Sequence, residues 1–224
     1  MSLLRAGAGR PFDAAAAAPV AVDAVGSADV TNFPGGTSVN FNNLTVGAGA
    51  NRALLAIFCF GNNASPPTSI SVTWNGVGLT QIANTLVHDG TDIGIVMFGL
   101  ANPASGNQTL AFSWTGTQAY SVDAISFTGV DQSTPFTNGV NASGVGTTQN
   151  PGTITSPVGD YAAAAFASTV TYSAVDPTQL FQDTGASFPV GAANYTAGTG
   201  TLALTTTTAS STRWAASGVN VKQG

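Results

Sequence analysis

The chain offers few side chains that could do acid–base or nucleophilic chemistry. His88 is the only histidine, so a mechanism of the Ser-His-Asp type would have to use it. Asp89 follows it directly, but neighbouring strand residues point to opposite faces of a sheet, which favours a hairpin flank over a catalytic pair. All ten acidic residues are Asp, so a pair of carboxylates for acid–base work would need two of them.

Asp123 is the most interesting of these carboxylates, because it stands among apolar residues in "YSVDAISF". A buried carboxylate needs a partner that compensates for its lost hydration. Asp123 alternates with Val122 and Ala124, however, so the simpler interpretation is the solvent-facing side of a half-exposed sheet. We therefore assign no catalytic residue and predict a protein that is not an enzyme.

Cation binding has equally little support. The oxygens of Asp89 and Asp92 could hold Ca²⁺, which prefers oxygen ligands, but a polar hairpin loop explains the same residues. Cys59 is the only cysteine and lies in the apolar run "ALLAIFCF". It can form neither an internal disulfide nor a zinc cluster, and we expect a buried thiol. The sequence predicts no metal and no cofactor.

Aromatic and amide side chains suggest a different chemistry, the binding of a sugar. Trp74 precedes Asn75-Gly76 in "SVTWNGVGLTQ" and could stack on a sugar ring. Asn-Gly between two β-type segments is also the strongest short signal for a type I′ hairpin turn, and packing of Trp74 at a strand end is the favoured interpretation. Amides and hydroxyls also serve as solubilising groups in a chain so poor in charge. The candidates for glycan binding are Trp74, Asn138, Asn141, Tyr172 and Tyr195.

The composition predicts the elements that must position these residues. Charged residues make up 7% of the chain, against a usual share of about 25%. The helix former Glu is absent and Lys222 is the only lysine, whereas Thr, Val, Gly and Asn favour strands and turns. A chain of 224 residues is long enough for one buried core. We therefore expect a single all-β domain.

Short strands separated by clusters of Gly, Pro, Asn and Ser are expected from residue 20 onward. In "TLAFSW", Leu110, Phe112 and Trp114 share one face, as in a strand with one buried side. "ALLAIFCF" does not alternate and suits a central strand covered on both sides. About twelve strands predict one antiparallel two-sheet sandwich that is jelly-roll-like. The expected strands are 20–25, 38–46, 52–60, 69–74, 77–83, 92–100, 108–114, 119–128, 161–169, 191–197, 201–207 and 212–221.

Two parts are expected along the chain, an N-terminal extended arm (residues 1–19) and a β-sandwich domain (residues 20–224). The arm is rich in Ala and Gly, and Pro19 stops any helix that the alanine run begins. We predict that Arg5, Arg10 and Phe12 dock the arm onto another subunit. The alternative, an arm that packs on its own domain, stays open.

Charge and hydropathy argue against two classes of partner. The net charge of −5 and the pI near 4.3 argue against nucleic-acid binding, which needs clustered Lys or Arg. The longest apolar runs are about eight or nine residues, short of the ~20 that span a bilayer, so no membrane partner is expected. Charged residues and Pro11 interrupt "MSLLRAGAGRPFD" before an apolar segment forms, so no export signal is predicted.

From Ile70 onward, three stretches follow one another in the order "SVTWNGVGLTQI", "FGLANPASGNQTLAFSW" and "AISFTGVDQSTPF", and the chain ends with "RWAASGVNV". Together they resemble a poorly characterised jelly-roll β-sandwich family of phage structural and bacterial surface proteins, over residues 38–221. The shared motifs are turn and core signatures. The resemblance implies recognition at an extracellular or virion surface, and it supplies no catalytic residue.

These observations predict a non-enzymatic structural accessory protein of a phage virion, of capsid-decoration or fibre type. Interfaces are depleted in Lys and Glu, and the expected edge strands lack the lysines that discourage pairing. A virion protein made in the host cytoplasm needs no export signal. The expected partners are other virion subunits, such as a major capsid protein, and further copies of the chain, as a trimer by analogy. The alternative is an extracellular carbohydrate-binding module or adhesin that contacts a host glycan.

Overall fold

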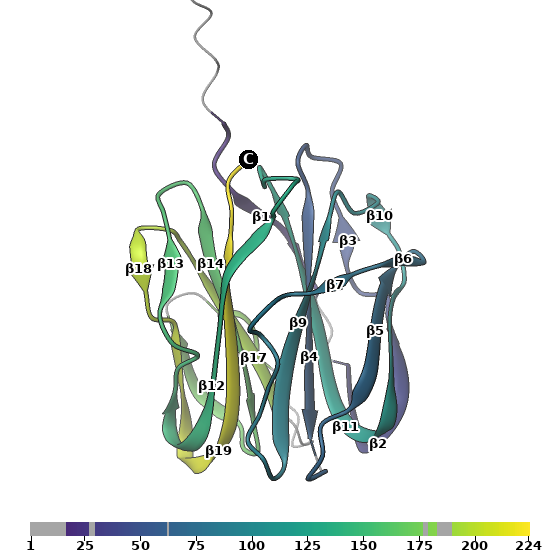
Figure 1. The fold of residues 1–224 in the computed structure, drawn as a ribbon, viewed down its shortest axis with the longest axis vertical. Coiled ribbons are helices and arrows are strands. Elements are labelled where there is room, and N and C mark those ends of the chain that lie inside the picture. Colours follow the sequence, from purple (N-terminus) through teal and green to yellow (C-terminus); the bar gives the residue numbers. More distant parts are fainter. Residues whose placement is uncertain (1–16, 27–29, 62, 177–178, 183–189) are drawn as a thin grey trace, which may run out of the picture.

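The structure is a computed structural model that describes residues 17–26, 30–61, 63–176, 179–182 and 190–224, and these residues form strands and no helix (Figure 1). The strand pairs in these ranges are antiparallel. The predicted all-β antiparallel sandwich is confirmed. Of the expected arm, only residues 17–19 are described, so Arg5, Arg10 and Phe12 lie outside the described residues.

The N-terminal sheet has nine strands and encloses a core of its own. Its main path runs β6-β5-β11-β4-β9-β7, with β1 and β2 paired to β11 and β8 paired to β9, while β3 and β10 form a separate two-stranded ladder. In chain order, the strands of this sheet and of the β3–β10 ladder are β1 (Ala21–Val25), β2 (Val30–Phe41), β3 (Thr45–Val46), β4 (Ala53–Gly61), β5 (Thr68–Trp74), β6 (Val77–Gly78), β7 (Thr80–Gln81), β8 (Val87–His88), β9 (Ile93–Ala101), β10 (Gly106–Asn107) and β11 (Leu110–Thr128).

The C-terminal sheet has six strands in the order β12-β19-β14-β17-β16, with β15 paired to β19. Strands β13 and β18 form a second two-stranded ladder. In Figure 1 these strands occupy the left half of the molecule and the N-terminal sheet the right half. The strands are β12 (Phe136–Gln149), β13 (Ile154–Ser156), β14 (Tyr161–Ser168), β15 (Tyr172–Asp176), β16 (Gln179–Gln182), β17 (Val190–Ala197), β18 (Gly200–Leu202) and β19 (Thr205–Val221).

Strand β4 separates two cores. Leu55 and Ile57 face the core shared by the two sheets, whereas Phe58 and Phe60 face the core inside the N-terminal sheet. Successive side chains of a strand point to opposite faces, so a strand with apolar residues at every position can serve two cores. Every residue of β4 is buried, which confirms the prediction for "ALLAIFCF".

Strand β14 has the same role in the C-terminal sheet, but with small side chains. Ala163 and Ala165 face the shared core, and Ala164 and Phe166 face a third core beside the β13–β18 ladder. The N-terminal sheet sends mainly Ile, Leu, Met and Phe into the shared core, and the C-terminal sheet mainly Ala. Large residues opposite small ones let the two layers interdigitate.

The longest strand differs from the prediction. Segments 108–114 and 119–128 were expected as separate strands, but β11 runs through both without a break. Its first part pairs with β5 and its second part with β4, so the strand changes partner near Gly116, which has a φ of 94°. The exposed turn-like residues Thr115 to Thr117 therefore mark a bend within one strand and not its end.

Other boundaries also moved. Strand β12 was not predicted, because its four Asn and Gly residues among the first nine resemble a loop, and its packing on β19 overrides that local preference. The single strand expected over 38–46 ends at Phe41 and resumes at Thr45, at the place where the alternation of apolar residues slips. The Asn75-Gly76 turn is confirmed by φ values of 49° and 78°. At Asp89-Gly90 only the glycine has a positive φ.

Candidate interaction surface

Strand β12 forms one edge of the C-terminal sheet. It is 14 residues long, and in the described part of the chain its ladder partner is β19 alone, from Phe136 opposite Val221 to Gln149 opposite Thr206. The outer side of an edge strand presents unpaired backbone N–H and C=O groups, which are a template for a further strand. The sequence predicted unprotected edges in general but not this strand.

The β12 edge lacks two of the usual protections against such pairing, charge and proline. Its sequence FTNGVNASGVGTTQ contains no charged residue and no proline. In the second half of β12, the side chain of Val145 is 70% exposed, and Ser143 and Thr147, two residues before and after it, are exposed too. The first half of the edge is partly covered, by the approach of Gly139 to Ala83, and the uncharged second half is the part that lies open to solvent in the isolated chain.

The first half of β12 is anchored by two asparagine side chains. Asn138 Nδ2 donates to the carbonyl of Thr155 at 2.9 Å, and Asn141 Nδ2 donates to the carbonyl of Asn84 at 2.8 Å. Both asparagines were predicted as candidates for glycan contact, and the structure places both on the strand β12. Their amide nitrogens hold neighbouring segments against it.

The aromatic glycan candidates do not form a common site with these asparagines. Trp74 is fully buried, and its indole Nε1 donates to the carbonyl of Ala104 at 2.9 Å, so the packing interpretation is the one the structure supports. Tyr172 lies on β15 and is 6% exposed, which leaves little ring surface for stacking. Tyr195 on β17 is half-buried and stacks on Tyr161, with ring centroids 5.8 Å apart.

Asp89 holds a hairpin loop and links the two sheets. Its Oδ1 accepts hydrogen bonds from the backbone nitrogens of Thr91, Asp92 and Ile93, and its Oδ2 accepts one from Arg213 of β19 at 3.1 Å. Burial raises the pKa of Asp89, but the three backbone donors and the guanidinium outweigh burial and lower the pKa to about 2. Both carboxylate oxygens of Asp89 are thus occupied by hydrogen bonds within the protein.

His88 is also used within its hairpin. Its Nδ1 accepts a hydrogen bond from the backbone nitrogen of Gly90 at 3.1 Å, and its ring stacks on Phe60 with centroids 6.0 Å apart. Within the described ranges, no cluster of three or more His, Cys, Asp or Glu side chains is placed to hold a metal ion. Cys59 is buried, as expected, and its Sγ lies 3.8 Å from the carbonyl of Phe166.

The expectation of a solvent-facing Asp123 is wrong. Its side chain is 2% exposed, because this part of β11 contributes to two cores, with Val122 in the core inside the N-terminal sheet and Ile125 in the shared core. Asp123 has an interaction partner within the protein. Alternation with apolar neighbours could not distinguish a solvent-facing residue from a buried polar one, since that depends on a second layer packing on the sheet.

The three cationic side chains in the described residues all tie segments of the fold together. Arg52 donates to the carbonyls of Gly49 and Pro103, Arg213 pairs with Asp89, and Lys222 Nζ lies 2.8 Å from Asp131 Oδ2. Hydrogen bonds from Lys222 first, and from the Ser133–Thr134 turn second, hold the pKa of Asp131 well below its usual range. Little positive charge is left for a ligand.

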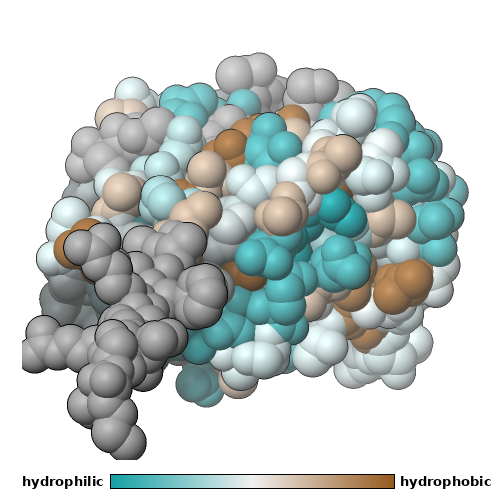
Figure 2. Space-filling model, turned by 90° about the horizontal axis from the view of Figure 1, so that it is seen from above, coloured by the Kyte–Doolittle hydropathy of each residue, from teal (hydrophilic) through white to brown (hydrophobic). Residues whose placement is uncertain are grey.

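The end of the molecule that carries the C-terminus is hydrophilic or neutral over most of its surface, with hydrophobic residues scattered among polar ones (Figure 2). In the described part of the chain, none of the elements is a helix with the length and apolarity to cross a bilayer.

No protein-family model, curated protein or solved structure matches the chain. The resemblance to phage and bacterial surface sandwiches therefore stays a prediction.

Proposed function

We propose that the protein is a non-enzymatic structural subunit of a phage virion, of capsid-decoration or fibre type, that acts through contacts with other proteins. The open edge of β12 carries this proposal. The second half of this edge strand, residues 143–149, has no charge and no proline, and it invites uncontrolled pairing unless another surface covers it. A neighbouring subunit in a particle supplies such a cover.

The use of charge in the chain supports the same function. Glu is absent and Lys222, the one lysine, is paired with Asp131, in line with the depletion of both residue types at interfaces. The proposed partners are other virion subunits, such as a major capsid protein, and further copies of this chain, assembled as a trimer. The proposed location is the virion, and an extracellular location is the alternative.

The root of the N-terminal arm is held by the domain. The carbonyl of Ala17 accepts a hydrogen bond from Gln223 Nε2 at 2.7 Å, and Val20 is buried with its backbone nitrogen bonded to the carbonyl of Gly159 at 2.9 Å. Residues 17–20 therefore have a defined place beside the C-terminus. Docking of the arm through its two arginines and its phenylalanine remains part of the proposal.

Measuring the mass of the purified chain by light scattering tests the proposal. We expect the wild type to self-associate and V145K to be monomeric, because a lysine on an exposed edge strand opposes pairing. V158K is the matched control, since Val158 is 84% exposed but lies outside the strands, and its mass should equal that of the wild type. A wild type that stays monomeric and does not attach to particles contradicts the proposal.

A further inference from the structure

Three adjoining hollows follow the seam between the two sheets, where β7 faces the start of β12. Their volumes are about 370, 470 and 380 Å³. The first and second hollows share Ile82, Ala83 and Phe136, and the second and third share Thr137 and Asn138. Each hollow shares wall residues with the next, and we call this row of three hollows the seam groove.

A β-bulge in β12 shapes the seam groove. Residues 137–140 of β12 lie opposite the shorter segment 218–220 of β19, so β12 carries one extra residue there. Asn138 in the bulge has a φ of 51°, and a bulge turns a side chain out of the regular alternation. Asn138 consequently lines two hollows. Gly139 lets the opposite wall approach, because a Cβ at this position would lie 2.1 Å from the carbonyl oxygen of Ala83.

Phe136 provides an apolar surface at the junction of the first two hollows. Its ring rests on the backbone of β9 at Gly99, where a Cβ would lie 2.3 Å from the ring. The residue is half-buried and lines both hollows. A supported aromatic ring among convergent polar groups is a common arrangement in sites for small organic ligands.

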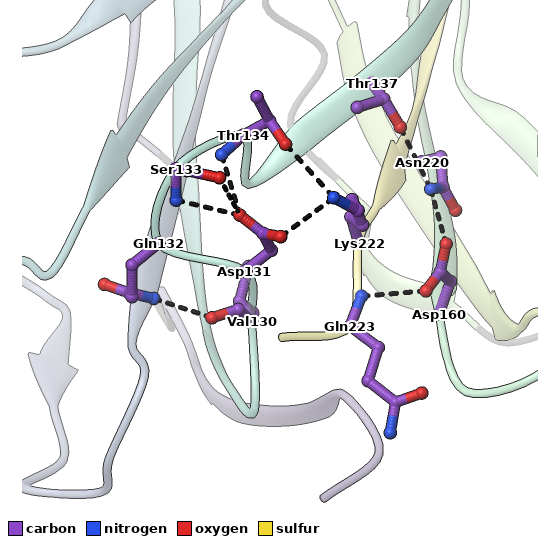
Figure 3. A network of polar contacts seen from close by, with 10 residues as sticks. All are labelled: Val130, Asp131, Gln132, Ser133, Thr134, Thr137, Asp160, Asn220, Lys222 and Gln223. Atoms are coloured by element: carbon purple, nitrogen blue, oxygen red, sulfur yellow. Dashed lines mark hydrogen bonds and ion pairs between the residues drawn. The ribbon is translucent and has the colours of Figure 1, made fainter. Parts of the chain in front are cut away.

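The charged groups at the third hollow are paired within the protein (Figure 3). Lys222 Nζ donates to Asp131 at 2.8 Å and to Thr134 Oγ1 at 3.3 Å. Asp160 accepts from Asn220 Nδ2 at 2.7 Å and from a backbone nitrogen at 2.7 Å. What the seam groove offers to a ligand is therefore mainly amides and hydroxyls, without a free cation that would select an anion.

Asn220 adds an unused acceptor to the wall of the third hollow. Its side chain is 2% exposed, its Nδ2 donates to Asp160 and Thr137, and its Oδ1 accepts no hydrogen bond within the described residues. Buried acceptors in folded proteins nearly always have a donor. Oδ1 is itself shielded from solvent, so an enclosed water, and not a ligand in the groove, fits this need.

We propose that the seam groove binds a neutral oligosaccharide. Asn138 Nδ2 bonds the carbonyl of Thr155, so its Oδ1 meets a sugar hydroxyl, together with the amide of Gln81, and Phe136 contacts the apolar face of a sugar ring. An extended peptide would instead pair with a strand edge, but at the groove the start of β12 is closed by the approach of Gly139 to Ala83. This ligand site is independent of the β12 edge proposed for subunit contacts.

A printed array of neutral and acidic oligosaccharides, followed by calorimetry with the strongest neutral ligand, tests the proposal. N138G removes an amide while keeping a residue that tolerates a positive φ, and Q81A removes an exposed amide from the first hollow. Each variant should weaken binding about tenfold, the effect of losing a hydrogen bond or two. S143A, exposed on β12 outside the groove, should bind as the wild type does.

Three results would overturn the proposal: no binding to any neutral oligosaccharide, a preference for acidic ones, or unchanged affinity in both groove variants. Selective binding to extended peptides, measured on a peptide array in parallel, would overturn it as well. The monomeric variant V145K is assayed beside the wild type. Sugar binding by both chains separates this proposal from the one on subunit contacts, since either can fail alone.

Discussion

The N-terminal and C-terminal sheets build their hydrophobic cores from different kinds of residues. The N-terminal sheet encloses an aromatic cluster in which Phe58 contacts Phe60, Phe112 and Trp114, with ring centroids 5.5, 5.9 and 4.6 Å apart. The C-terminal sheet contributes mostly alanine to its two cores. It also buries more polar side chains, among them Gln149, Asn194, Thr206, Thr208, Ser217 and Asn220.

The difference indicates that the halves depend on each other unequally. Large buried side chains stabilise in proportion to the apolar area that they remove from water, so the aromatic core can support the N-terminal sheet. Alanine removes little area, and the C-terminal sheet therefore gains much of its stability from packing on its neighbour. The open β12 edge belongs to this weaker half, which suits a sheet that is completed by contact with another subunit.

The largest expected effect comes from the aromatic cluster. F58A should lower the free energy of unfolding by about 3–5 kcal/mol, since it removes a large ring from a fully buried site. A164G, at a buried position of β14 in the third core, should cost about 0.5–1 kcal/mol. Urea denaturation of both variants measures the contrast. Equal losses would show that the two cores contribute alike.

A turn of the N-terminal sheet offers a smaller effect with a matched control. G76A should cost about 1–2 kcal/mol, because Gly76 has a φ of 78°, which a residue with a Cβ adopts reluctantly. G146A in β12 should leave the free energy of unfolding unchanged or raise it slightly, since a Cβ at Gly146 meets no atom within 4 Å. Thermal denaturation compares the two, and a larger loss in G146A would contradict the assignment of β12 as an open edge.

The ion pair between Asp89 and Arg213, which links the two sheets, should have the smallest effect on the free energy of unfolding, and this effect should depend on pH. Asp89 has a folded pKa of about 2 against an ordinary value of 3.8, so its stabilising contribution is complete above pH 4 and is lost as the pH falls towards 2. D89N should cost about 1 kcal/mol at pH 7, after allowance for solvent screening at the exposed guanidinium of Arg213. Urea denaturation from pH 7 to pH 2 should show the difference from the wild type vanish between pH 4 and 2. A difference that is constant down to pH 2 would assign the loss to packing.

The local elements with strong signals were predictable. The Asn75-Gly76 turn follows from the positive φ that both residues tolerate, and the buried central strand follows from eight consecutive apolar residues in "ALLAIFCF". The bent strand β11 and the glycine-rich β12 were not predictable in the same way. Gly116 and Gly139 resemble loop residues locally, and each becomes part of a strand only because neighbouring strands pair with the chain on both sides of it.

The candidate sites were less accessible to sequence reasoning than the fold. The aromatic residues Trp74 and Tyr172 and the carboxylate of Asp123 have chemistry that fits either a site or a core, and the structure buries all three. Asn138 was singled out by its type, but its position in a bulge beside Phe136 depends on how β12 and β7 meet. The unused acceptor of Asn220 carries no sequence signal at all.

The sequence by itself determined that the chain forms strands, that few ionised groups remain for ligands, and that sharp turns fall at particular Asn-Gly and Gly positions. These properties depend on the preferences of single residues and their near neighbours. Only the tertiary structure decided which edge stays open and which polar groups converge on one groove. Both depend on the register of strands that are distant in the chain, and a shift of one residue would turn every side chain of a strand to the other face.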